Sequence, residues 1–353
     1  MMSKKAIFFV LVVVLLLGTA AFLFMVPSGG TYSSPVGIDT ERWWVKGVFV
    51  SPGGNDSGSC TRADPCRTFD KVVSMVHPGE TIHVLEGTYS EEFTITKSGT
   101  ARDYISIVGY DAILPGVVVS GNYIVVSGME VVGSESHGIL VNGKHIIVED
   151  SIVRHSVTEN GEGVCYGDGW WGSGLKVQVG GEDIILRRNS VYENCGEGIA
   201  VTRGVNVVVE DNIVRDNYSV NIYIDNSPFT VVQGNTVTCT GIYLRNDHRP
   251  TGIAVAEEFY EGWGAQRRNT SILNNMVDGC YDGIVSREPD VPDGMEINLL
   301  IKGNTVINGT RRSISIRWFN QNVWIENNTV YAPIHIINME GVTLLDNIEL
   351  EPE

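Results

Sequence analysis

Basic side chains recur on short strand-like segments of the chain and could take part in removing the proton on a carbon next to a carboxylate. Such a step needs a cation that neutralises the carboxylate and a base that accepts the neighbouring proton. Lysine and arginine can supply both functions. We therefore predict Lys176, Arg203 and Arg317 as catalytic residues, and a solvated strand face is the alternative interpretation of Lys176.

Acidic side chains at similar positions could hold a metal ion. Carboxylate oxygens are the ligands that Ca²⁺ prefers, so Asp225, Glu257 and Glu258 are predicted metal ligands, with Ca²⁺ as the candidate cofactor. A glycoside hydrolase would instead need two carboxyl groups roughly 5–9.5 Å apart, and the candidates for that pair are Asp225, Asp282, Glu257 and Glu258. Adjacent side chains point to opposite sides of a strand, so a solvated edge is the third interpretation of Glu257 and Glu258.

Aromatic side chains are frequent near these charged residues, and their flat rings could form platforms for sugars. An arginine among them could contact an acidic group. The predicted substrate-binding residues are Trp170, Trp171, Tyr223, Tyr260, Trp263, Arg287 and Trp318. Burial of Trp170 and Trp171, which would only fold their loop onto the domain, is the alternative for that pair.

A repeated phrase indicates which elements position these residues. GVNVVVEDNIVRDN at residues 204–217 is echoed by EDIILRRNSVYEN, FTVVQGNTV, NLLIKGNTV and NVWIENNTV. Aligned on the residue two before the final valine, the phrases give a base period near 23 residues with insertions at some steps. The aligned residues are Ser151, Asn189, Asn212, Asn235, Asn275, Asn304, Asn328 and Asn347. A period of this length is typical of a solenoid.

Each repeat also contains a second run, such as EGIAVTRG or TGIAVAEE, in which apolar and outward residues alternate. Short strands separated by Gly and Asn turns, without a helical pattern between them, predict an all-β parallel β-helix. The leucine skeleton of leucine-rich repeats is missing, and propeller blades need about 40 residues each. Strands of neighbouring coils would pair about 4.8 Å apart, and each recurring Asn would hydrogen-bond the next coil at a corner.

Stacking of the coils places equivalent residues in columns on the outer face of the second strand. One predicted column is Lys176, Ala200, Tyr223, Ala254, Val285 and Ser315. The next is Gln178, Thr202, Asp225, Ala256 and Arg317. Insertions at residues 158–172, 238–250, 257–269 and 286–298 are predicted to wall a groove over this face. The small floor residues would leave room for a flat ligand.

Six cysteines in an exported chain indicate disulfides. The predicted pairs are Cys60–Cys66, Cys165–Cys195 and Cys239–Cys280. Cys239 and Cys280 follow their aligned asparagines in consecutive coils and would lie within bonding distance. No CxxC spacing occurs among the last four cysteines, which argues against a zinc site.

The N-terminus indicates export. Lys4 and Lys5 precede an uncharged run over residues 6–26, which is long enough to cross a bilayer. We predict a signal anchor over residues 1–26 that places the rest of the chain outside the cytoplasm, and a cleaved export signal is the alternative. Residues 27–45 are the expected linker and residues 46–350 the β-helix domain. The formal net charge of −17 argues against nucleic acid as a partner.

A short amphipathic helix is expected at the start of the domain. Phe69, Val72, Val73 and Val76 in CRTFDKVVSMVHPGE follow helical spacing, and Pro78-Gly79 would end the helix. This helix would cover the first coil, where an open strand edge would otherwise aggregate.

The segments VFVSPGGNDSGS, PCRTFDKVVSMVHPGETIHVLEGTYSEEFTI and YIVVSGMEVVGSESHGILV resemble the opening of exported right-handed β-helix proteins of the pectate-lyase-like superfamily. The resemblance is closest to polysaccharide lyases of the pectate and chondroitin/alginate types. It implies a right-handed parallel β-helix and an acidic polysaccharide as the partner. Pectate-type lyases use an acidic calcium cluster near a catalytic lysine, whereas GDGWWGSGLK holds Asp168 and Lys176 without clustered aspartates. A non-catalytic glycan-binding surface protein and a hydrolase or epimerase are the alternatives.

Overall fold

The computed structural model describes residues 46–161, 165–166, 172–244, 249–258, 268–286, 297–309, 311–317, 322–337 and 341–350. Lys46–Glu353 form one compact unit. The predicted anchor and linker lie outside the described residues. Among the described residues, no helix combines the length and the apolar composition needed to cross a bilayer.

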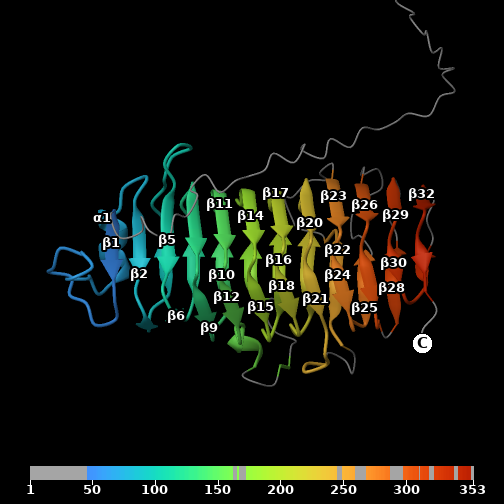
Figure 1. Ribbon diagram of the computed structural model, residues 1–353, viewed down its shortest axis with the longest axis horizontal. Helices are drawn as coiled ribbons and strands as arrows, with labels where there is room; N and C mark the ends of the chain where they lie inside the picture. Colours follow the sequence, from blue (N-terminus) through green and yellow to red (C-terminus); the bar gives the residue numbers. More distant parts are fainter. Residues whose placement is uncertain are drawn as a thin grey trace, which may run out of the picture. The chain divides into compact units, whose positions relative to one another are not determined.

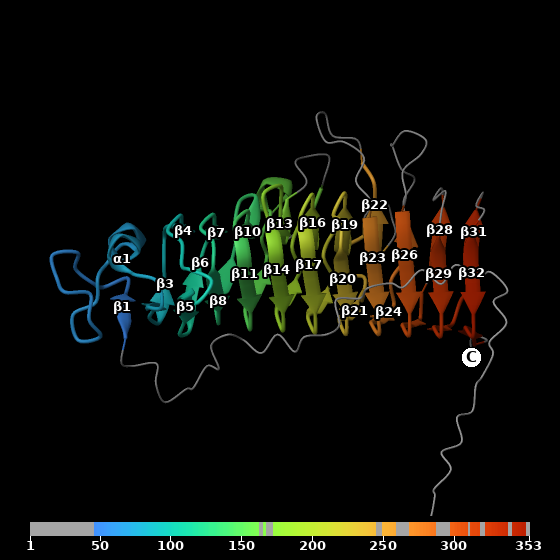
Figure 2. The same ribbon diagram turned by 90° about the horizontal axis from the view of Figure 1, so that it is seen from above.

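The described chain winds into coils that stack along one axis, and each full coil adds one strand to each of three parallel sheets. Figures 1 and 2 show the coils following one another from blue to red, with the helix α1 at the blue end. The architecture is a right-handed parallel β-helix, so the predicted all-β solenoid is confirmed, whereas the transmembrane helix predicted before it stays a prediction.

Within each sheet the strands follow one another in chain order, and each is hydrogen-bonded to the next. The 12-stranded sheet contains β1 (Gly47–Val50), β2 (Thr81–Val84), β5 (Ile105–Gly109), β8 (Ile124–Ser127), β11 (Lys144–Glu149), β14 (Glu182–Arg187), β17 (Val205–Glu210), β20 (Thr230–Gln233), β23 (Arg268–Leu273), β26 (Ile297–Lys302), β29 (Val323–Glu326) and β32 (Val342–Leu345). The 11-stranded sheet contains β3 (Gly87–Thr88), β6 (Ala112–Leu114), β9 (Glu130–Val132), β12 (Ile152–Arg154), β15 (Ser190–Tyr192), β18 (Ile213–Arg215), β21 (Thr236–Thr238), β24 (Met276–Asp278), β27 (Thr305–Ile307), β30 (Thr329–Val330) and β33 (Ile348–Glu349). The 10-stranded sheet contains β4 (Phe93–Ile95), β7 (Val117–Val119), β10 (His137–Val141), β13 (Ser173–Val177), β16 (Glu197–Thr202), β19 (Val220–Asp225), β22 (Thr251–Ala256), β25 (Asp282–Ser286), β28 (Arg312–Arg317) and β31 (Ile334–Ile337).

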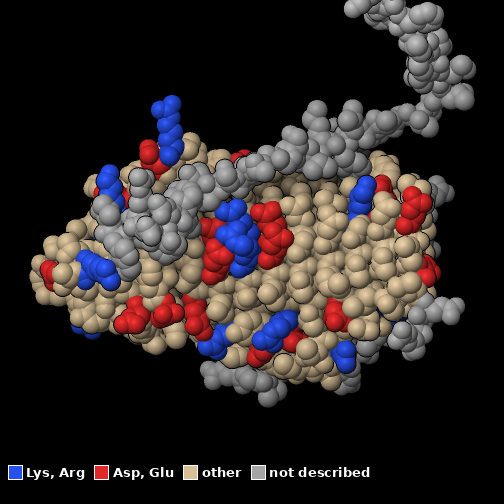
Figure 3. Space-filling view, in the orientation of Figure 1, with Lys and Arg blue, Asp and Glu red and all other residues tan. Residues whose placement is uncertain are grey.

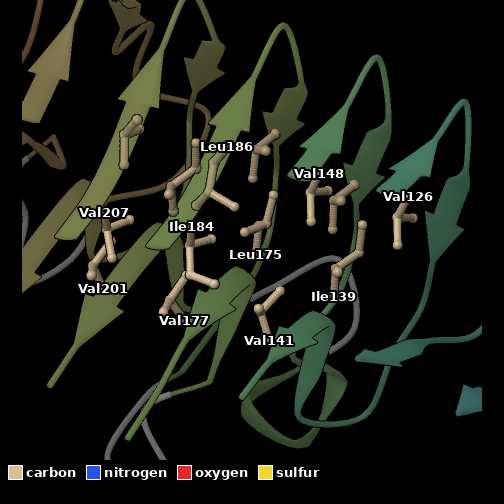
Figure 4. Close-up of a cluster of buried hydrophobic side chains, with 14 of the residues drawn as sticks. Val126, Ile139, Val141, Val148, Leu175, Val177, Ile184, Leu186, Val201 and Val207 are labelled. Carbon is tan, nitrogen blue, oxygen red and sulfur yellow. The ribbon is translucent and has the colours of Figure 1, made fainter. Parts of the chain in front are cut away.

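The core consists of β-branched and leucine side chains that point inward from all three sheets. Ile139, Leu175 and Ile199 come from successive strands of the 10-stranded sheet and are fully buried. Figure 4 shows Ile139 and Leu175 packed beside Val148 and Leu186 of the 12-stranded sheet. Removal of this apolar surface from water is the main force that holds the coils together.

The predicted asparagine ladder is confirmed. From Asn189 to Asn328, each ladder side chain donates both to the next ladder asparagine and to a backbone carbonyl. For example, Nδ2 of Asn212 donates to Oδ1 of Asn235 (3.0 Å) and to the carbonyl oxygen of Leu186 (2.9 Å). Oδ1 of Asn235 also accepts the backbone N–H of Asn212 (3.0 Å). The same pattern continues to Asn347, so the ladder satisfies polar groups that the bends bury.

The helix α1 (Phe69–Met75) is confirmed at the start of the domain. The side chain of Thr68 caps it by accepting the N–H of Lys71 (3.4 Å). The ring of Phe69 stacks on that of Phe93 in β4, with centroids 4.5 Å apart. The only other helix in the described part is a single 3₁₀ turn, Thr158–Asn160.

All three predicted disulfides are confirmed. The Cα atoms are 4.6 Å apart in Cys60–Cys66, 5.2 Å in Cys165–Cys195 and 4.8 Å in Cys239–Cys280. The last pair joins consecutive coils. Disulfides persist in oxidising compartments, so three of them indicate a location outside the cytoplasm.

Charged residues on the 12-stranded sheet pair with one another between coils. Figure 3 shows a group of basic and acidic side chains over the region where Figure 1 places β11, β14 and β17. Glu149 in β11 pairs with Arg187 in β14 (2.6 Å) and with Arg188 (2.9 Å). Arg188 also pairs with Asp150 (2.8 Å), so the two arginines and two carboxylates balance and this group is a structural feature of the stack.

Candidate functional site

The outer face of the 10-stranded sheet carries the predicted column of floor residues. The strand register pairs Lys176 with Ala200, Ala200 with Tyr223, and Tyr223 with Ala254. The column continues through Val285 to Ser315. Thr202, Asp225 and Ala256 also pair in register, as predicted for the second column.

The predicted room above the small floor residues is not open, and this expectation was wrong. Ala200 and Ala254 are fully buried, and Ala256 is 1% exposed. They form an apolar cluster on the outer face together with Val220, Tyr223 and Val285. The small side chains allow close packing on this face. The polar groups of the site lie beside this apolar cluster and at its ends.

A third outward column was missed by the sequence reasoning. His137 pairs with Ser173 and Ser173 with Glu197, and further along the stack Asp282 pairs with Arg312. His137, Ser173 and Glu197 are each followed by a glycine, which occupies an inward position of the strand. A Cβ on Gly283, which follows Asp282, would lie 2.5 Å from the carbonyl oxygen of Ser313, so only glycine fits.

Lys176 lies at one end of the site, next to a histidine. Burial, together with the positive charge of Lys176, lowers the pKa of His137 to about 4. The imidazole is therefore neutral at physiological pH. Its Nδ1 accepts the N–H of Ser173 (3.1 Å), while the Ser173 hydroxyl donates to Oε2 of Glu197 (3.0 Å). A cation and a neutral base thus stand on neighbouring coils.

The middle of the site is an acidic group built from two consecutive coils. The Tyr223 hydroxyl donates to Oε1 of Glu258 (2.6 Å). Oδ1 of Asp225 accepts the backbone N–H of Glu258 (3.0 Å) and Nδ2 of Asn226 (2.7 Å). Asp225 and Glu257 are buried, whereas Glu258 is exposed. Burial and the charges of Asp225 and Glu258 raise the pKa of Tyr223, which keeps the hydroxyl protonated as a donor.

Arg203 follows β16 directly, in a left-handed turn with φ 59°. Its backbone N–H donates to the carbonyl oxygen of Asp225 (2.9 Å). The residue therefore borders the coil of the acidic group, one coil beyond Lys176.

The far end of the site is a hollow of about 200 Å³ over β22, β25 and β28. Its lining residues are Thr251, Asp282, Val285, Ser286, Arg311, Ser315 and Arg317. We call this cavity the arginine hollow. Arg317 is the one member of this set that the sequence predicts as a catalytic residue.

The predicted catalytic trio is not brought together. Five register steps separate Lys176 from Ser315, which shares a strand with Arg317. At about 4.8 Å per step this is roughly 24 Å. Lys176 and Arg317 therefore cannot act on the same bond of a substrate, whereas Lys176 and Arg203 lie on consecutive coils.

The predicted metal ligands lie on consecutive coils, but they do not form an evident cation cage. Among the described residues there is no group of three His, Cys, Asp or Glu side chains arranged to hold a metal. Ca²⁺ takes six to eight oxygen ligands, and Oδ1 of Asp225 is already an acceptor for two donors. The described residues therefore do not fit a Ca²⁺ site by themselves.

Six predicted substrate-binding residues lie outside the described residues and remain predictions. They are Trp170, Trp171, Tyr260, Trp263, Arg287 and Trp318. Tyr223 is the one member of that prediction with a described position.

The chain is similar in sequence to a known protein family and to two curated proteins. Residues 48–291 match the family model "Pel9A-like, right handed beta helix region". The chain is 27% identical over 205 residues to the uncharacterized protein YwoF of Bacillus subtilis (strain 168), a match that covers 50% of this chain and 42% of YwoF. It is 25% identical over 182 residues to pectate lyase L of Dickeya dadantii (strain 3937), covering 45% of this chain and 39% of that protein. The matches thus span about two fifths of the length of both curated relatives.

A solved structure shares the fold. The crystal structure of pectate lyase Pel9A superposes with a TM-score of 0.56 at 17% sequence identity. The match covers 84% of this chain and 78% of that structure. At this identity the likeness concerns the fold alone.

Proposed function

The chain belongs to the family of Pel9A-like right-handed β-helix proteins, and we propose that it binds and cleaves an acidic polysaccharide on the outer face of its 10-stranded sheet. One observation carries the proposal. Polar and charged side chains from successive coils, from Lys176 through Glu258 to Arg317, gather on this face. A polymer lying along the stack would meet them one after another.

The reaction we propose is a β-elimination. Lys176 acts as the base in its unprotonated amine form and accepts the proton on the carbon next to the sugar carboxylate, with Arg203 as the neighbouring cation. The electron pair of the broken C–H bond forms a carbon–carbon double bond, and the glycosidic carbon–oxygen bond breaks. The leaving oxygen keeps the electron pair of the broken carbon–oxygen bond and takes a proton from water, so the products are a new chain end and an unsaturated sugar.

We place the protein outside the cytoplasm. The three disulfides support this location. The membrane anchor at residues 1–26 stays a prediction from the sequence, which fractionation of cells that express the full chain would test.

A second candidate function is non-catalytic glycan binding at the envelope. The separation of Lys176 from Arg317 by roughly 24 Å favours it. A hydrolase or epimerase on the same face is a third candidate, and Asp225 and the neighbouring glutamates would be its carboxyl groups.

The test incubates the full chain with a panel of uronate polymers, with and without Ca²⁺, and follows the absorbance of unsaturated products. Product that disappears in Lys176→Met supports the lyase, and a strict need for Ca²⁺ would support the predicted cation ligands. New reducing ends without unsaturation would indicate a hydrolase. Binding without any product would favour the second candidate. Neither binding nor product across the panel would refute the proposal.

A further inference from the structure

The arginine hollow combines two features that a ligand would satisfy, and the first is positive charge. Arg311, Arg312 and Arg317 come from one short segment of a chain whose formal net charge is −17. Arg311 pairs with Oδ2 of Asp282 (3.2 Å), and Arg312 donates to Oγ of Ser315 (3.3 Å). Asp282 is the single acidic residue among the described side chains that line the hollow.

Arg317 is the cation that remains available in the hollow. Its backbone N–H and carbonyl are both bonded to the Ser286 hydroxyl, at 2.8 and 3.1 Å. Arg317 lines the cavity, and its guanidinium makes no hydrogen bond or ion pair with a described side chain. Burial and the charges of Arg311 and Arg317 lower the pKa of Arg312, which reports mutual repulsion in this group. An anion placed here would relieve that repulsion.

The second feature is an unsatisfied acceptor. Asp282 is 9% exposed and lines the hollow. Its Oδ1 atom is buried and has no hydrogen-bond partner among the described residues. Buried polar atoms in native proteins are nearly always satisfied, so this atom calls for a donor from a ligand or from water.

We propose that the arginine hollow is a subsite for one uronic acid unit, with the carboxylate on Arg317 and a sugar hydroxyl donating to Oδ1 of Asp282. The planar guanidinium matches a carboxylate through two parallel hydrogen bonds. A cavity of about 200 Å³ has room for one sugar ring and not for a long segment. The subsite rests on the proposed function, and it assigns Arg317 to holding substrate, about five coils from Lys176.

The test titrates the full chain with galacturonate, glucuronate and mannuronate by isothermal calorimetry. Galactose supplies the hydroxyls without the carboxylate, and acetate supplies the carboxylate without the hydroxyls. We expect at least one uronate to bind about tenfold more tightly than either. Arg317→Gln should weaken that binding about tenfold or more, and Arg317→Lys should weaken it less because it retains the charge. Arg154→Gln, which removes an arginine paired with Glu130 on the 11-stranded sheet, is the matched control and should leave it unchanged.

The outcomes separate this subsite from the proposed function. Uronate binding that is absent, or unchanged in both Arg317 variants, overturns the subsite even if polymers are cleaved. Equal affinity for acetate and uronate overturns the role of Asp282. Monosaccharide binding that needs Arg317, in a protein that neither binds nor cleaves any polymer, supports the subsite and refutes the proposed function.

Discussion

The Tyr223 hydroxyl donates a 2.6 Å hydrogen bond to Oε1 of Glu258, and the two residues belong to consecutive coils. The tyrosine is 5% exposed, whereas Glu258 follows β22 and is exposed. A buried donor thus fixes the position of an accessible carboxylate in the middle of the outer face. This contact links the packing of the coils to the chemistry of the site.

Tyr223→Phe should therefore lower stability and change its pH dependence. We expect the free energy of unfolding to fall by about 1.5–3 kcal/mol near pH 8, since the lost bond has a charged acceptor. The raised pKa of Tyr223 means that its contribution is fully present below the unfolded value near 10 and is lost as the pH rises further. Denaturation between pH 8 and 11 should show a steeper alkaline loss in the wild type. Parallel curves for the two proteins would contradict this.

His137 should titrate far below an ordinary histidine. Its folded pKa of about 4 lies under the unfolded value near 6.5. The stability that the neutral ring contributes is therefore present above pH 6.5 and lost as the pH falls toward 4. NMR titration of the ring should show this pKa, and Lys176→Met should raise it by removing a nearby charge. The exposed Lys144→Met is the control; a midpoint near 6.5, or no response to Lys176→Met, would show that the pair is not arranged as described.

Asn235→Ala should be strongly destabilising. It leaves the N–H and Nδ2 of Asn212 without their acceptor inside the stack. At about 1–3 kcal/mol for each of these two buried unsatisfied groups, the expected loss is about 2–6 kcal/mol. Asn308→Gly removes an exposed hydrogen bond to Asp278 and retains the left-handed backbone, so it should be nearly neutral. Similar losses in chemical denaturation of the two variants would contradict the role of the ladder.

The ion pairs of the 12-stranded sheet should contribute to stability according to how deeply they are buried. Arg187→Met leaves the fully buried Glu149 with only Arg188, and we expect a loss of about 3 kcal/mol. Lys302→Met breaks an exposed pair with Glu326 and should cost about 0–1 kcal/mol. Thermal denaturation of both variants tests the contrast, and equal changes would show that Glu149 is not buried in solution.

The sequence could predict the coils because each repeat carries its own register. Once the asparagines at positions 189 and 212 are aligned, the Lys176 column and the Cys239–Cys280 disulfide follow from stacking. Strict alternation of inward and outward side chains would place Asp282 inward. Gly283 and Ile284 both occupy inward positions, which breaks the alternation at the start of the strand and leaves Asp282 outward. The glycine that stands second in most of these strands could have indicated this break in the alternation.

Contacts made by the insertions could not be predicted from the sequence either. The bond from Tyr223 to Glu258 joins a strand to a residue just past the next coil's strand, and no repeat fixes that side chain. The burial of Ala200 and Ala254 likewise depends on what packs over the outer face. Small residues in the sequence fit a packed floor as well as an open one.

The most direct test of the central claim compares the three faces of the stack in polysaccharide binding. Lys176→Gln and Arg317→Gln alter the 10-stranded sheet, whereas Arg154→Gln and Lys302→Gln alter the other two. Affinity electrophoresis of the full chain in the uronate polymer that it binds best should show weaker binding only for the first two variants. Unchanged binding in both of them, or an equal loss in Arg154→Gln or Lys302→Gln, would contradict the assignment of the site to this face.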